Sequence, residues 1–522
     1  MSRADLVVVG GGPRALMALV ALDDALVGQQ GGPDTHPGVL RRPRVAVVEP
    51  GSPGPGAVWE TGQPDHRRLN VDAGLLDLRG AAVACSYAEW ARREGEQSAG
   101  YPPRAVIGRY LAWAWRQLTA SPRLQLRHHR ARADGIERTG DDWTVTTSAG
   151  DLIAPEVLLC TGHAGGIGID HRAVSTRTAG QVVTVRGAAL TAMDVAFDLT
   201  AGRGGVWTTT PATRSGLTYH RSGTEPESMV WVSRSGALLA PKPLVRDDAA
   251  AAAVRAHTAA LGAGSDPDDE WWQVLIDAAC AAADLAGRRL DPAAAIAVLD
   301  DDGGPADPWQ RWADDLARAS GQVDDDPAWW LGRAWSYGYA DVVASLERAP
   351  RHRATWERFR ARAARLERWS FGPPAISVRR LLALRDAGML DLVTDGRPSQ
   401  VDAVTIGPGI LTAARPWDVE APLPPAHDAL WQGLLDRGLV TVRPGERGVF
   451  TTPAGLCVGA DGVAGEGLAA LGRPTEDPVI GHDTLSRTLH RDADRWAARV
   501  AATVSSDRSG NGTSDPVLAV TP

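Results

Sequence analysis

The chain lacks the features that mark several large protein classes. Its four cysteines (Cys85, Cys160, Cys280 and Cys457) lie far apart, with no CxxC pair and no metal-ligand spacing. This argues against a disulfide framework or a zinc site and favours a reducing, cytoplasmic location. A net charge of −8 gives no basic field for nucleic acid or anionic membranes. No run reaches the roughly 18 to 20 apolar residues of a membrane span, and Gly10 interrupts the N-terminal run too early for a signal peptide.

What the chain does contain is an ordinary globular composition, with 44% hydrophobic and 23% charged residues over 522 positions. This length leaves room for two or three domains and a large core. Arginine replaces nearly all lysine, and 19 tryptophans outnumber 4 phenylalanines. We interpret both biases as genomic base composition without chemical meaning.

The N-terminal stretch "DLVVVGGGPRALMALVAL" predicts a strand at residues 5–9 and an apolar helix at 15–27. After a Gly- and Pro-rich loop at residues 28–43, "RVAVVEP" predicts a second strand at 44–50. Together these elements form a β-α-β unit, whose two parallel strands require a right-handed crossover.

The glycine turn of this unit fits the dinucleotide fingerprint G-x-G-x-x-G/A. Gly10 permits the tight turn, Gly12 lets backbone amides approach a pyrophosphate at the positive helix end, and Ala15 keeps helix and strand close. Pro13 and Arg14 complete the first helical turn. The sequence therefore predicts a dinucleotide on this unit.

Glu49 ends the second predicted strand, where a carboxylate can accept both hydroxyls of an adenosine ribose. It stands 39 positions after Gly10, whereas the usual separation is about 20. The loop at 28–43 accounts for the excess, so we assign Glu49 to the same site.

A second strand-glycine-helix unit occupies residues 181–205, with Gly187 and Ala189 at its turn. It lacks the second glycine of the fingerprint, so the alternative is a domain that packs like a nucleotide site and binds nothing. Downstream arginines beside serines suit a ribose 2′-phosphate and favour NADPH over NADH. These residues are Arg221, Ser222, Arg234 and Ser235.

Two further segments are candidates for the cofactor edge. "LCTGH" at residues 159–163 is typical of the hinge at which two-dinucleotide flavoproteins leave the first domain, so Thr161 and Gly162 are predicted beside FAD. His163 is a candidate proton carrier, although hinge histidines are more often structural. "RRLNVDAG" at residues 67–74 is predicted to cover the flavin ring, or else to be a surface Ω-loop. Its candidate residues are Asn70 and Val71 for the cofactor and Asn70 and Asp72 for the chemistry.

The expected fold class is α/β, with two dinucleotide-binding domains and a helical insertion. We assign residues 1–166 and 400–503 to an FAD-binding domain and residues 167–248 and 371–399 to an NAD(P)-binding-like domain. The alanine-, tryptophan- and arginine-rich segment 249–370 is the helical insertion, and 504–522 is expected to be a disordered tail. In the C-terminal part we expect a strand and loop at 455–471 and a closing helix at 483–500.

The motif order resembles that of bacterial FAD/NAD(P)-binding proteins of the NAD_binding_9 type. The resemblance covers roughly residues 4–245 and rests on several segments. They are "VVGGGPRAL", "RVAVVEP", "RRLNVDAG", "YPPRAVIGRYL", "LLCTGH", "VRGAALTAMDVAFDLTAGRGG", "YHRSGTEP" and "WVSRSG". Ala189 departs from the glycine that this family often has. The resemblance implies a two-dinucleotide flavoprotein that binds FAD on its N-terminal unit.

The best understood members resemble flavin-dependent amino-acid N-monooxygenases, which oxidise aspartate to nitrosuccinate in natural-product pathways. This implies FAD, NADPH, O2 and a small amine or amino-acid substrate. An acidic amino acid needs arginines for its carboxylates, preferably bidentate ones. The candidates are Arg67, Arg68, Arg104 and Arg415, with His66 and His163 as proton carriers.

Two other functions stay open at this point. One is a flavin dehydrogenase or oxidase that takes hydride from its substrate and has no working NADPH site. The other is a non-catalytic flavin-binding partner protein whose insertion, residues 249–370, is an interaction surface. A homodimer is also compatible with the sequence.

Overall fold

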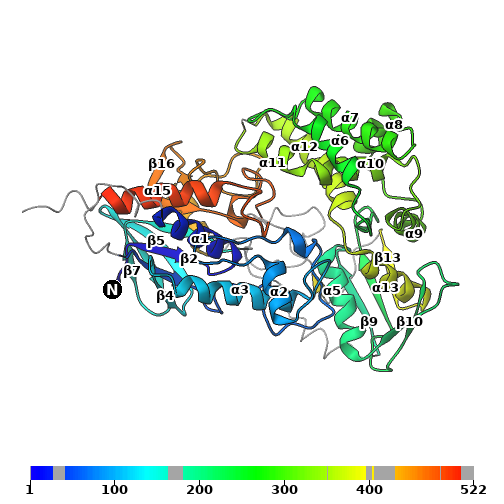
Figure 1. Cartoon of the computed structure of the whole chain (residues 1–522), viewed down its shortest axis with the longest axis horizontal. Coiled ribbons are helices and arrows are strands. Elements are labelled where there is room, and N and C mark those ends of the chain that lie inside the picture. The colour runs from blue at the N-terminus through cyan, green and yellow to red at the C-terminus, as the bar shows by residue number, and fades with distance from the viewer. Residues whose placement is uncertain are drawn as a thin grey trace, which may run out of the picture.

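The computed structural model divides the chain into three parts (Figure 1). An N-terminal α/β unit carries the closing helix, a second α/β unit follows, and a group of helices lies beside both. The structure describes residues 2–27, 42–162, 180–301, 303–349, 351–394, 403–404, 429–482 and 484–506. None of the described helices is both long and apolar enough to cross a membrane.

The main sheet of the first unit has the strand order β15-β16-β8-β2-β3-β4. Neighbouring strands from β16 to β4 are parallel, and β15 pairs antiparallel with β16. The central strands β2 and β8 are entirely buried, as expected of a parallel sheet covered on both faces. The strands are β2 (Leu6–Val9), β3 (Arg44–Val48), β4 (Gln125–His129), β8 (Val157–Leu159), β15 (Leu456–Val458) and β16 (Ala464–Ala470).

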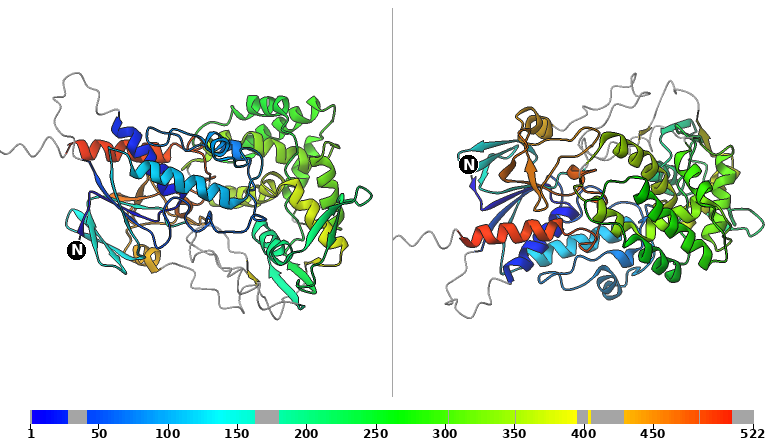
Figure 2. Two further views of the ribbon diagram at one scale, coloured as in Figure 1. Left: turned by 60° about the horizontal axis from the view of Figure 1, so that its bottom comes forward. Right: turned by 90° about the horizontal axis from the view of Figure 1, so that it is seen from above.

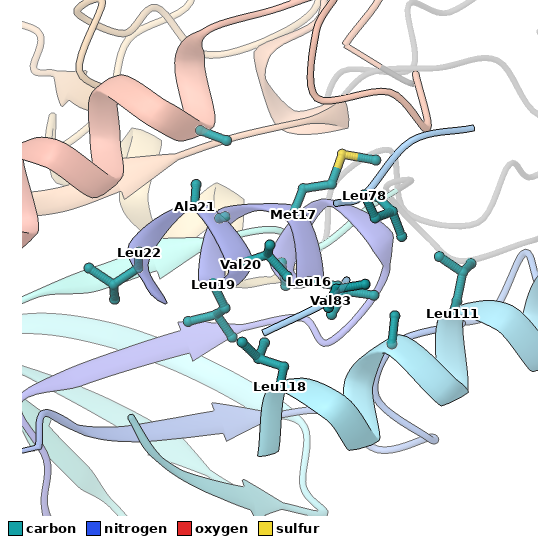
Figure 3. Close-up of a cluster of buried hydrophobic side chains, with 14 of the residues drawn as sticks. Leu16, Met17, Leu19, Val20, Ala21, Leu22, Leu78, Val83, Leu111 and Leu118 are labelled. Carbon is teal, nitrogen blue, oxygen red and sulfur yellow. The ribbon is translucent and has the colours of Figure 1, made fainter. Parts of the chain in front are cut away.

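Three helices cover one face of this sheet, and the first of them is buried on every side. α1 (Pro13–Val27) is almost wholly apolar, and Figure 3 shows it between α3 (Arg104–Thr119) and α15 (Asp492–Ser506). Both views in Figure 2 show the red helix α15 alongside α1. The glycine turn therefore leads into a helix that exposes no apolar stripe to solvent.

The other face of the main sheet packs against a small second sheet and α14 (Ala429–Asp436). Its strand order is β1-β7-β6-β5. These strands are β1 (Ser2–Arg3), β5 (Ala133–Thr139), β6 (Asp142–Thr147) and β7 (Leu152–Ala154). Short elements η1 (Ala73–Leu75) and α2 (Tyr87–Glu94) lie between β3 and α3, and η3 (Arg473–Thr475) follows β16.

The second unit has a parallel sheet of order β13-β12-β9-β14. Helices α5 (Leu190–Asp198) and α13 (Ala375–Asp386) and the hairpin β10-β11 pack with it. The remaining bounds are β9 (Val182–Arg186), η2 (Ala201–Arg203), β10 (Val206–Thr209), β11 (Leu217–His220), β12 (Ser228–Val232), β13 (Leu390–Val393) and β14 (Ala403–Val404). Our boundary at residue 400 assigned β14 to the first unit, but its pairing with β9 assigns it to the second.

The helical part begins and ends where the composition changes. Three of its helices, α8, α9 and α10, begin with an Asp-Pro pair, in which the aspartate caps the first turn and the proline occupies the first helical position. Its core combines alanine and leucine with six buried tryptophans. The helices are α6 (Asp248–Thr258), α7 (Asp269–Leu285), α8 (Pro292–Asp300), α9 (Pro308–Ala319), α10 (Pro327–Tyr337), α11 (Tyr339–Leu346) and α12 (Arg353–Ser370).

Several sequence expectations need correction. α9 packs on α13 and places Trp309 and Trp312 in the core of the second unit, so the insertion is not a separate body. Residues 455–471 form two strands, β15 and β16, because the chain turns back on itself. The closing helix begins at Asp492, not at residue 483, and runs to Ser506. Residues 28–41 and 507–522 lie outside the described residues.

Candidate functional site

The carboxyl ends of four parallel strands meet at one edge of the main sheet. Gly10 follows β2, Glu49 follows β3, Cys160 follows β8, and Leu471 follows β16. Ligands of open parallel sheets bind outside this edge. The structure thus brings together the glycine turn, the acid and the hinge, which lie in separate parts of the sequence.

At Gly10 the backbone leaves no room for a residue with a side chain. Its φ is +93°, and a Cβ there would lie 2.3 Å from the carbonyl oxygen of Cys160. At Gly12 a Cβ would meet only the Cα of Gly56, at 3.9 Å. The space beside Gly12 lies at the positive end of α1, so the turn fits a pyrophosphate group.

Glu49 joins this turn directly. Its Oε2 accepts a hydrogen bond from the amide of Gly11 at 2.8 Å, and its Oε1 accepts one from the amide of Gly51 at 2.9 Å. Each carboxylate oxygen keeps a further lone pair for a ligand hydroxyl. The backbone amides of the turn therefore suit the pyrophosphate of a dinucleotide, and the carboxylate of Glu49 suits the hydroxyls of its adenosine ribose.

The loop at residues 51–56 packs over the glycine turn, a contact that the sequence analysis did not identify. The amide of Gly54 donates to the carbonyl of Gly11 at 2.7 Å. A Cβ at Gly56 would lie 3.0 Å from the Cα of Gly12. The signal was present as three glycines in "GSPGPG", which allow two chain segments to approach closely.

Arg14 holds the C-terminal segment against the start of α1. Its Nη2 donates to the carbonyl of His482, and its Nη1 lies 3.6 Å from the carboxylate of Asp492. The side chain of Arg14 is thus committed to the protein, while its backbone remains in the first helical turn. Ala15 is fully buried where helix and sheet meet.

At the hinge, Thr161 accepts a hydrogen bond from Trp431 Nε1 at 3.0 Å. Gly162 follows with a φ of +75°, and His163 lies outside the described residues. Burial raises the pKa of the adjacent Cys160 thiol to about 12, so this cysteine is not an activated nucleophile.

The segment "RRLNVDAG" runs antiparallel to residues 100–104. Leu69 donates its amide to Pro102 at 2.9 Å, and Ala73 donates to Gly100 at 2.8 Å. Asp72 is exposed and caps η1 by accepting from the amide of Gly74 at 2.7 Å. Val71 packs against the core of the first unit, so this segment is anchored along its length.

A small cavity lies between the two α/β units. Its volume is about 20 Å³, which is room for about one water molecule. It is lined by polar groups of the first unit and by α5 and the segment before α13 of the second. Its lining includes Arg68, Asn70, Arg104, Asp194, Pro373 and Pro374. Asn70 and Arg68, both named from sequence, therefore face the second unit across this space.

Two of the predicted substrate arginines bind protein carboxylates instead. Arg67 makes a bidentate pair with Asp198, with Nη2 2.6 Å from Oδ2, and His66 Nε2 lies 2.6 Å from Asp198 Oδ1. Arg104 makes a second bidentate pair, with Asp194, at 2.5 and 3.2 Å. Both acids belong to α5, so these pairs clamp the second unit onto the first.

The other two arginines differ. Arg68 donates from Nη1 to the carbonyl of Tyr101 at 2.8 Å, and among the described residues no carboxylate pairs with it. Arg415 lies outside the described residues. Burial raises the pKa of Asp194 despite the nearby Arg104, so this clamp stands in a poorly solvated interface.

At the second glycine turn, Gly187 has a φ of +111° and donates its amide to Val232 at 2.9 Å. Ala189 precedes α5 in extended conformation. Arg234 follows the carboxyl end of β12, beside this turn, with Ser235 next to it. Burial and the neighbouring Arg234 both lower the pKa of Arg368, so two cations gather at this edge.

Arg221 and Ser222 lie at the opposite end of β12. Arg221 Nη2 donates to the carbonyl of Glu227, which immediately precedes β12, at 2.9 Å. Ser222 Oγ donates to the carbonyl of Arg203 at 2.7 Å. Of the four residues predicted from sequence for the 2′-phosphate, Arg221 and Ser222 therefore lie away from Gly187, whereas Arg234 and the adjacent Ser235 follow the end of β12 beside it.

The sequence analysis missed Asp194 and Asp198. They stand four residues apart in the otherwise apolar helix "LTAMDVAFD", and this spacing places both on one helix face. Two acids on one face of a largely apolar helix indicate a basic partner surface, so the sequence did contain this information.

Comparison with known proteins gives one family match. Residues 7–164 match the NAD_binding_9 family, described as FAD-NAD(P)-binding. Nitrosuccinic acid synthase of Aspergillus oryzae is 31% identical over 268 residues, which cover 43% of this chain and 39% of that protein. An L-aspartate N-monooxygenase (nitrosuccinate-forming) of Streptomyces cremeus is 29% identical over 283 residues, covering 43% and 41%.

The chain thus spans about two fifths of the length of the curated relatives it matches. Among solved structures it is similar to the ornithine N-hydroxylase of Kutzneria sp. 744, with a TM-score of 0.47, 15% identity, and coverage of 97% of this chain and 100% of the other. For an open structure of cyclohexanone monooxygenase the TM-score is 0.43 at 12% identity, covering 98% and 89%. Residues 7–164, which contain the glycine turn, are thus similar to the NAD_binding_9 family of FAD-NAD(P)-binding proteins.

Proposed function

We propose that this protein is an FAD-dependent, NADPH-using monooxygenase that oxidises the amine nitrogen of a small, aspartate-like amino acid. The observation that carries the proposal is the way in which the two α/β units are joined. Two glycine turns, Gly10–Gly12 and Gly187–Ala189, belong to two parallel sheets that α5 clamps together across a cationic cavity. The partial identity to curated aspartate N-monooxygenases supports the choice of substrate.

In this proposal the first unit binds FAD. Gly10 and Gly12 leave room for the pyrophosphate at the start of α1, Glu49 accepts the ribose hydroxyls, and Thr161 and Gly162 border the flavin. When bound and reduced, the flavin supplies the activation of O2. The protein supplies orientation and exclusion of water.

The second unit binds NADPH in the same proposal. Gly187 and Ala189 form its turn, and Arg234 together with Arg368 holds the 2′-phosphate. A phosphate monoester needs cations at this place, whereas NADH does not. Arg221 and Ser222 have no part in this version of the site.

We place the substrate between the two units, which must move apart to admit it because the cavity of about 20 Å³ has room for only about one water molecule. Asn70 and Arg68 line the cavity, and their amide and guanidinium groups can orient an amino acid. Arg67 and Arg104 position the walls through their pairs with Asp198 and Asp194. Asp72 is exposed and caps a turn, so we give it no role with the substrate. His163 and Arg415 keep their proposed roles from sequence.

The test is anaerobic reduction of the FAD-loaded protein by NADPH and by NADH, followed by O2 with L-aspartate and other amines. The proposal expects faster reduction by NADPH and an N-oxidised product that depends on O2. Reduction of the flavin by an amine in the absence of NADPH would instead establish a dehydrogenase. No reduction by either donor would favour a non-catalytic flavin-binding protein.

A further inference from the structure

One helix of the second unit carries two acids that reach across to the first unit. Asp194 and Asp198 stand one turn apart on α5 and therefore share a helix face. Both acids bind arginines of the first unit. The other side chains of α5 that line the interdomain cavity are apolar, namely Leu190, Met193 and Phe197. The helix thus presents two carboxylates to the first unit from an otherwise apolar face.

The arginines that receive these acids are fixed next to each other by the backbone of the first unit. The amide of Arg104 donates to the carbonyl of Arg67 at 2.8 Å, and Arg68 forms an antiparallel bridge with Pro103. Nε of Arg104 donates to the carbonyl of Arg68 at 3.0 Å. All of these contacts lie within the first unit, so the three arginines do not need α5 to keep their places.

Arg104 already holds a carboxylate in the geometry that arginine prefers. Its Nη1 and Nη2 donate to Oδ2 and Oδ1 of Asp194 at 2.5 and 3.2 Å, which makes a bidentate pair. Both residues line the interdomain cavity, and so does Arg68. Among the described residues no carboxylate pairs with Arg68, which donates to a backbone carbonyl. The cavity wall therefore contains one arginine that holds a carboxylate and a second arginine that holds none.

Asp194 is held in a place that suits a carboxylate only in part. The residue is 9% exposed, and burial raises the pKa of its carboxyl although Arg104 acts in the opposite direction. Removing water from a carboxylate is costly, and a single arginine offsets only part of that cost. If α5 moves away, Asp194 regains water, and Arg104 becomes open to another anion.

A second contact lies one turn further along α5. Asp198 accepts two hydrogen bonds from Arg67, at 3.1 and 2.6 Å, and its Oδ1 lies 2.6 Å from Nε2 of His66. The short helix η2 packs on the same histidine, since a Cβ at Gly202 would lie 3.3 Å from His66 Cε1. The two units are thus held closed at two successive turns of one helix.

We propose that the α5 face with Asp194 and Asp198 is a latch, in which Asp194 occupies the place of a substrate carboxylate. A small dicarboxylic acid opens this latch by replacing Asp194 on Arg104, and its second carboxylate binds Arg68. The pair of Asp198 with Arg67 parts in the same movement. The cavity of about 20 Å³ is the closed state of the site, because a dicarboxylic acid is several times larger than the one water molecule for which there is room. The latch rests on the proposed function only in taking the ligand to resemble the amino-acid substrate.

The latch predicts a preference for dicarboxylic over monocarboxylic acids. Opening breaks the pairs of both Asp194 and Asp198 with their arginines. A monocarboxylic acid restores one charged pair, on Arg104, whereas a dicarboxylic acid restores a second one on Arg68. We therefore expect succinate to open the latch, and we expect butyrate, which has the same carbon chain but one carboxylate, to leave it closed.

The first test is calorimetric titration of the FAD-loaded protein with succinate and with butyrate. Asp194→Asn removes the internal competitor at nearly constant size, and we expect it to bind succinate about tenfold more tightly than wild type, since a closed state lowers the apparent affinity. Asp198→Asn weakens only the closed state, so its gain should be smaller. Asp386→Asn breaks an exposed pair with Arg214 within the second unit and should bind succinate as wild type does.

A double variant tests whether the gain comes from Arg104. Arg104→Gln in the Asp194→Asn background removes both members of the pair, so no buried charge of this pair is left without its partner. It should therefore fold, and it should lose the affinity for succinate that Asp194→Asn gained. Small-angle X-ray scattering provides a second measurement. The radius of gyration of wild type should rise when succinate saturates the protein and stay constant with butyrate.

The proposal is overturned if Asp194→Asn binds succinate no more tightly than wild type, because Asp194 then does not compete. An unchanged radius of gyration in succinate-saturated wild type would show that the units do not part. Equal binding of butyrate and succinate would show that Arg68 takes no second carboxylate. Succinate binding by Asp194→Asn but not by wild type would support the latch, since wild type then stays closed.

The outcomes also separate the latch from the proposed function. If wild type oxidises L-aspartate, and Asp194→Asn keeps the wild-type KM and succinate affinity, the latch is wrong and the function stands. If wild type oxidises no amine, but Asp194→Asn gains succinate affinity that depends on Arg104, the function is wrong and the latch stands.

Discussion

Arg104, the first residue of α3, donates two hydrogen bonds, of 2.5 and 3.2 Å, to the carboxylate of Asp194 on α5. One turn further along α5, Asp198 is held in the same way by Arg67. Two arginines of the first unit thus fix one helix of the second. These pairs join the unit that carries the first glycine turn to the helix that follows the second.

Breaking this clamp from one side should destabilise the protein strongly. Arg104→Leu leaves the buried Asp194 without a counter-ion, a change that typically costs about 3 kcal/mol. The expected result is a lower urea midpoint, followed by intrinsic tryptophan fluorescence. Arg353→Leu breaks only an exposed pair with Glu357 and should lower the urea midpoint much less. Equal losses in the two variants would show that the clamp does not hold the units.

The two glycines of the first turn should respond differently to alanine. Gly10→Ala forces a positive φ and a clash with the Cys160 carbonyl, so we expect a loss of at least about 2 kcal/mol in folding stability. Gly12→Ala has room within the protein and should fold normally. It should nevertheless bind FAD at least about tenfold more weakly, or about 1.4 kcal/mol, because its methyl group occupies the pyrophosphate position. Thermal melts of the apoprotein and fluorescence titration with FAD distinguish the two effects.

Arg234 and Arg221 form a matched pair for testing the NADPH site. Arg234→Ala removes a cation at the carboxyl end of β12, and we expect the KM for NADPH to rise about tenfold, a loss of about 1.4 kcal/mol. The KM for NADH should not change. Arg221→Ala removes a cation at the amino end of β12 and should affect neither coenzyme. The reverse pattern would place the 2′-phosphate at the β10-β11 hairpin.

The stability of the protein should depend on the ionisation of Lys242. The pKa of Lys242 is about 7 in the folded protein, because of burial and then Arg333, and about 10.4 in the unfolded chain. Between these values the unfolded state binds more protons, so stability rises with pH across this window. Lys242→Met removes the effect, so its advantage over wild type should be largest below pH 7 and shrink as the pH rises. Denaturant unfolding of both proteins at several pH values measures it, and a pH-independent difference would contradict it.

Local patterns were enough to predict the first nucleotide unit. A buried strand, three glycines and an apolar helix are features of contiguous residues, and the conformational freedom of Gly10 is a property of the residue itself. The alanine-, tryptophan- and arginine-rich composition that begins near residue 249 is equally local, and it was enough to predict a helical part. Glu49 could be assigned because parallel strands place their carboxyl ends at one edge.

Roles that depend on a partner far away in the chain could not be obtained this way. Arg67, Arg68 and Arg104 look alike in the sequence, yet Arg67 and Arg104 pair with acids of α5, whereas Arg68 has no carboxylate partner among the described residues. Arg221 and Arg234 flank β12 in the sequence, but only the parallel pairing of β12 with β9 places Arg234, and not Arg221, beside the Gly187 turn. Lys242 shows the same division: the sequence alone determined that it is the single lysine. Only the tertiary structure decided that this charge is partly buried, with no carboxylate within ion-pair distance among the described residues, because electrostatic partnership depends on distance in space.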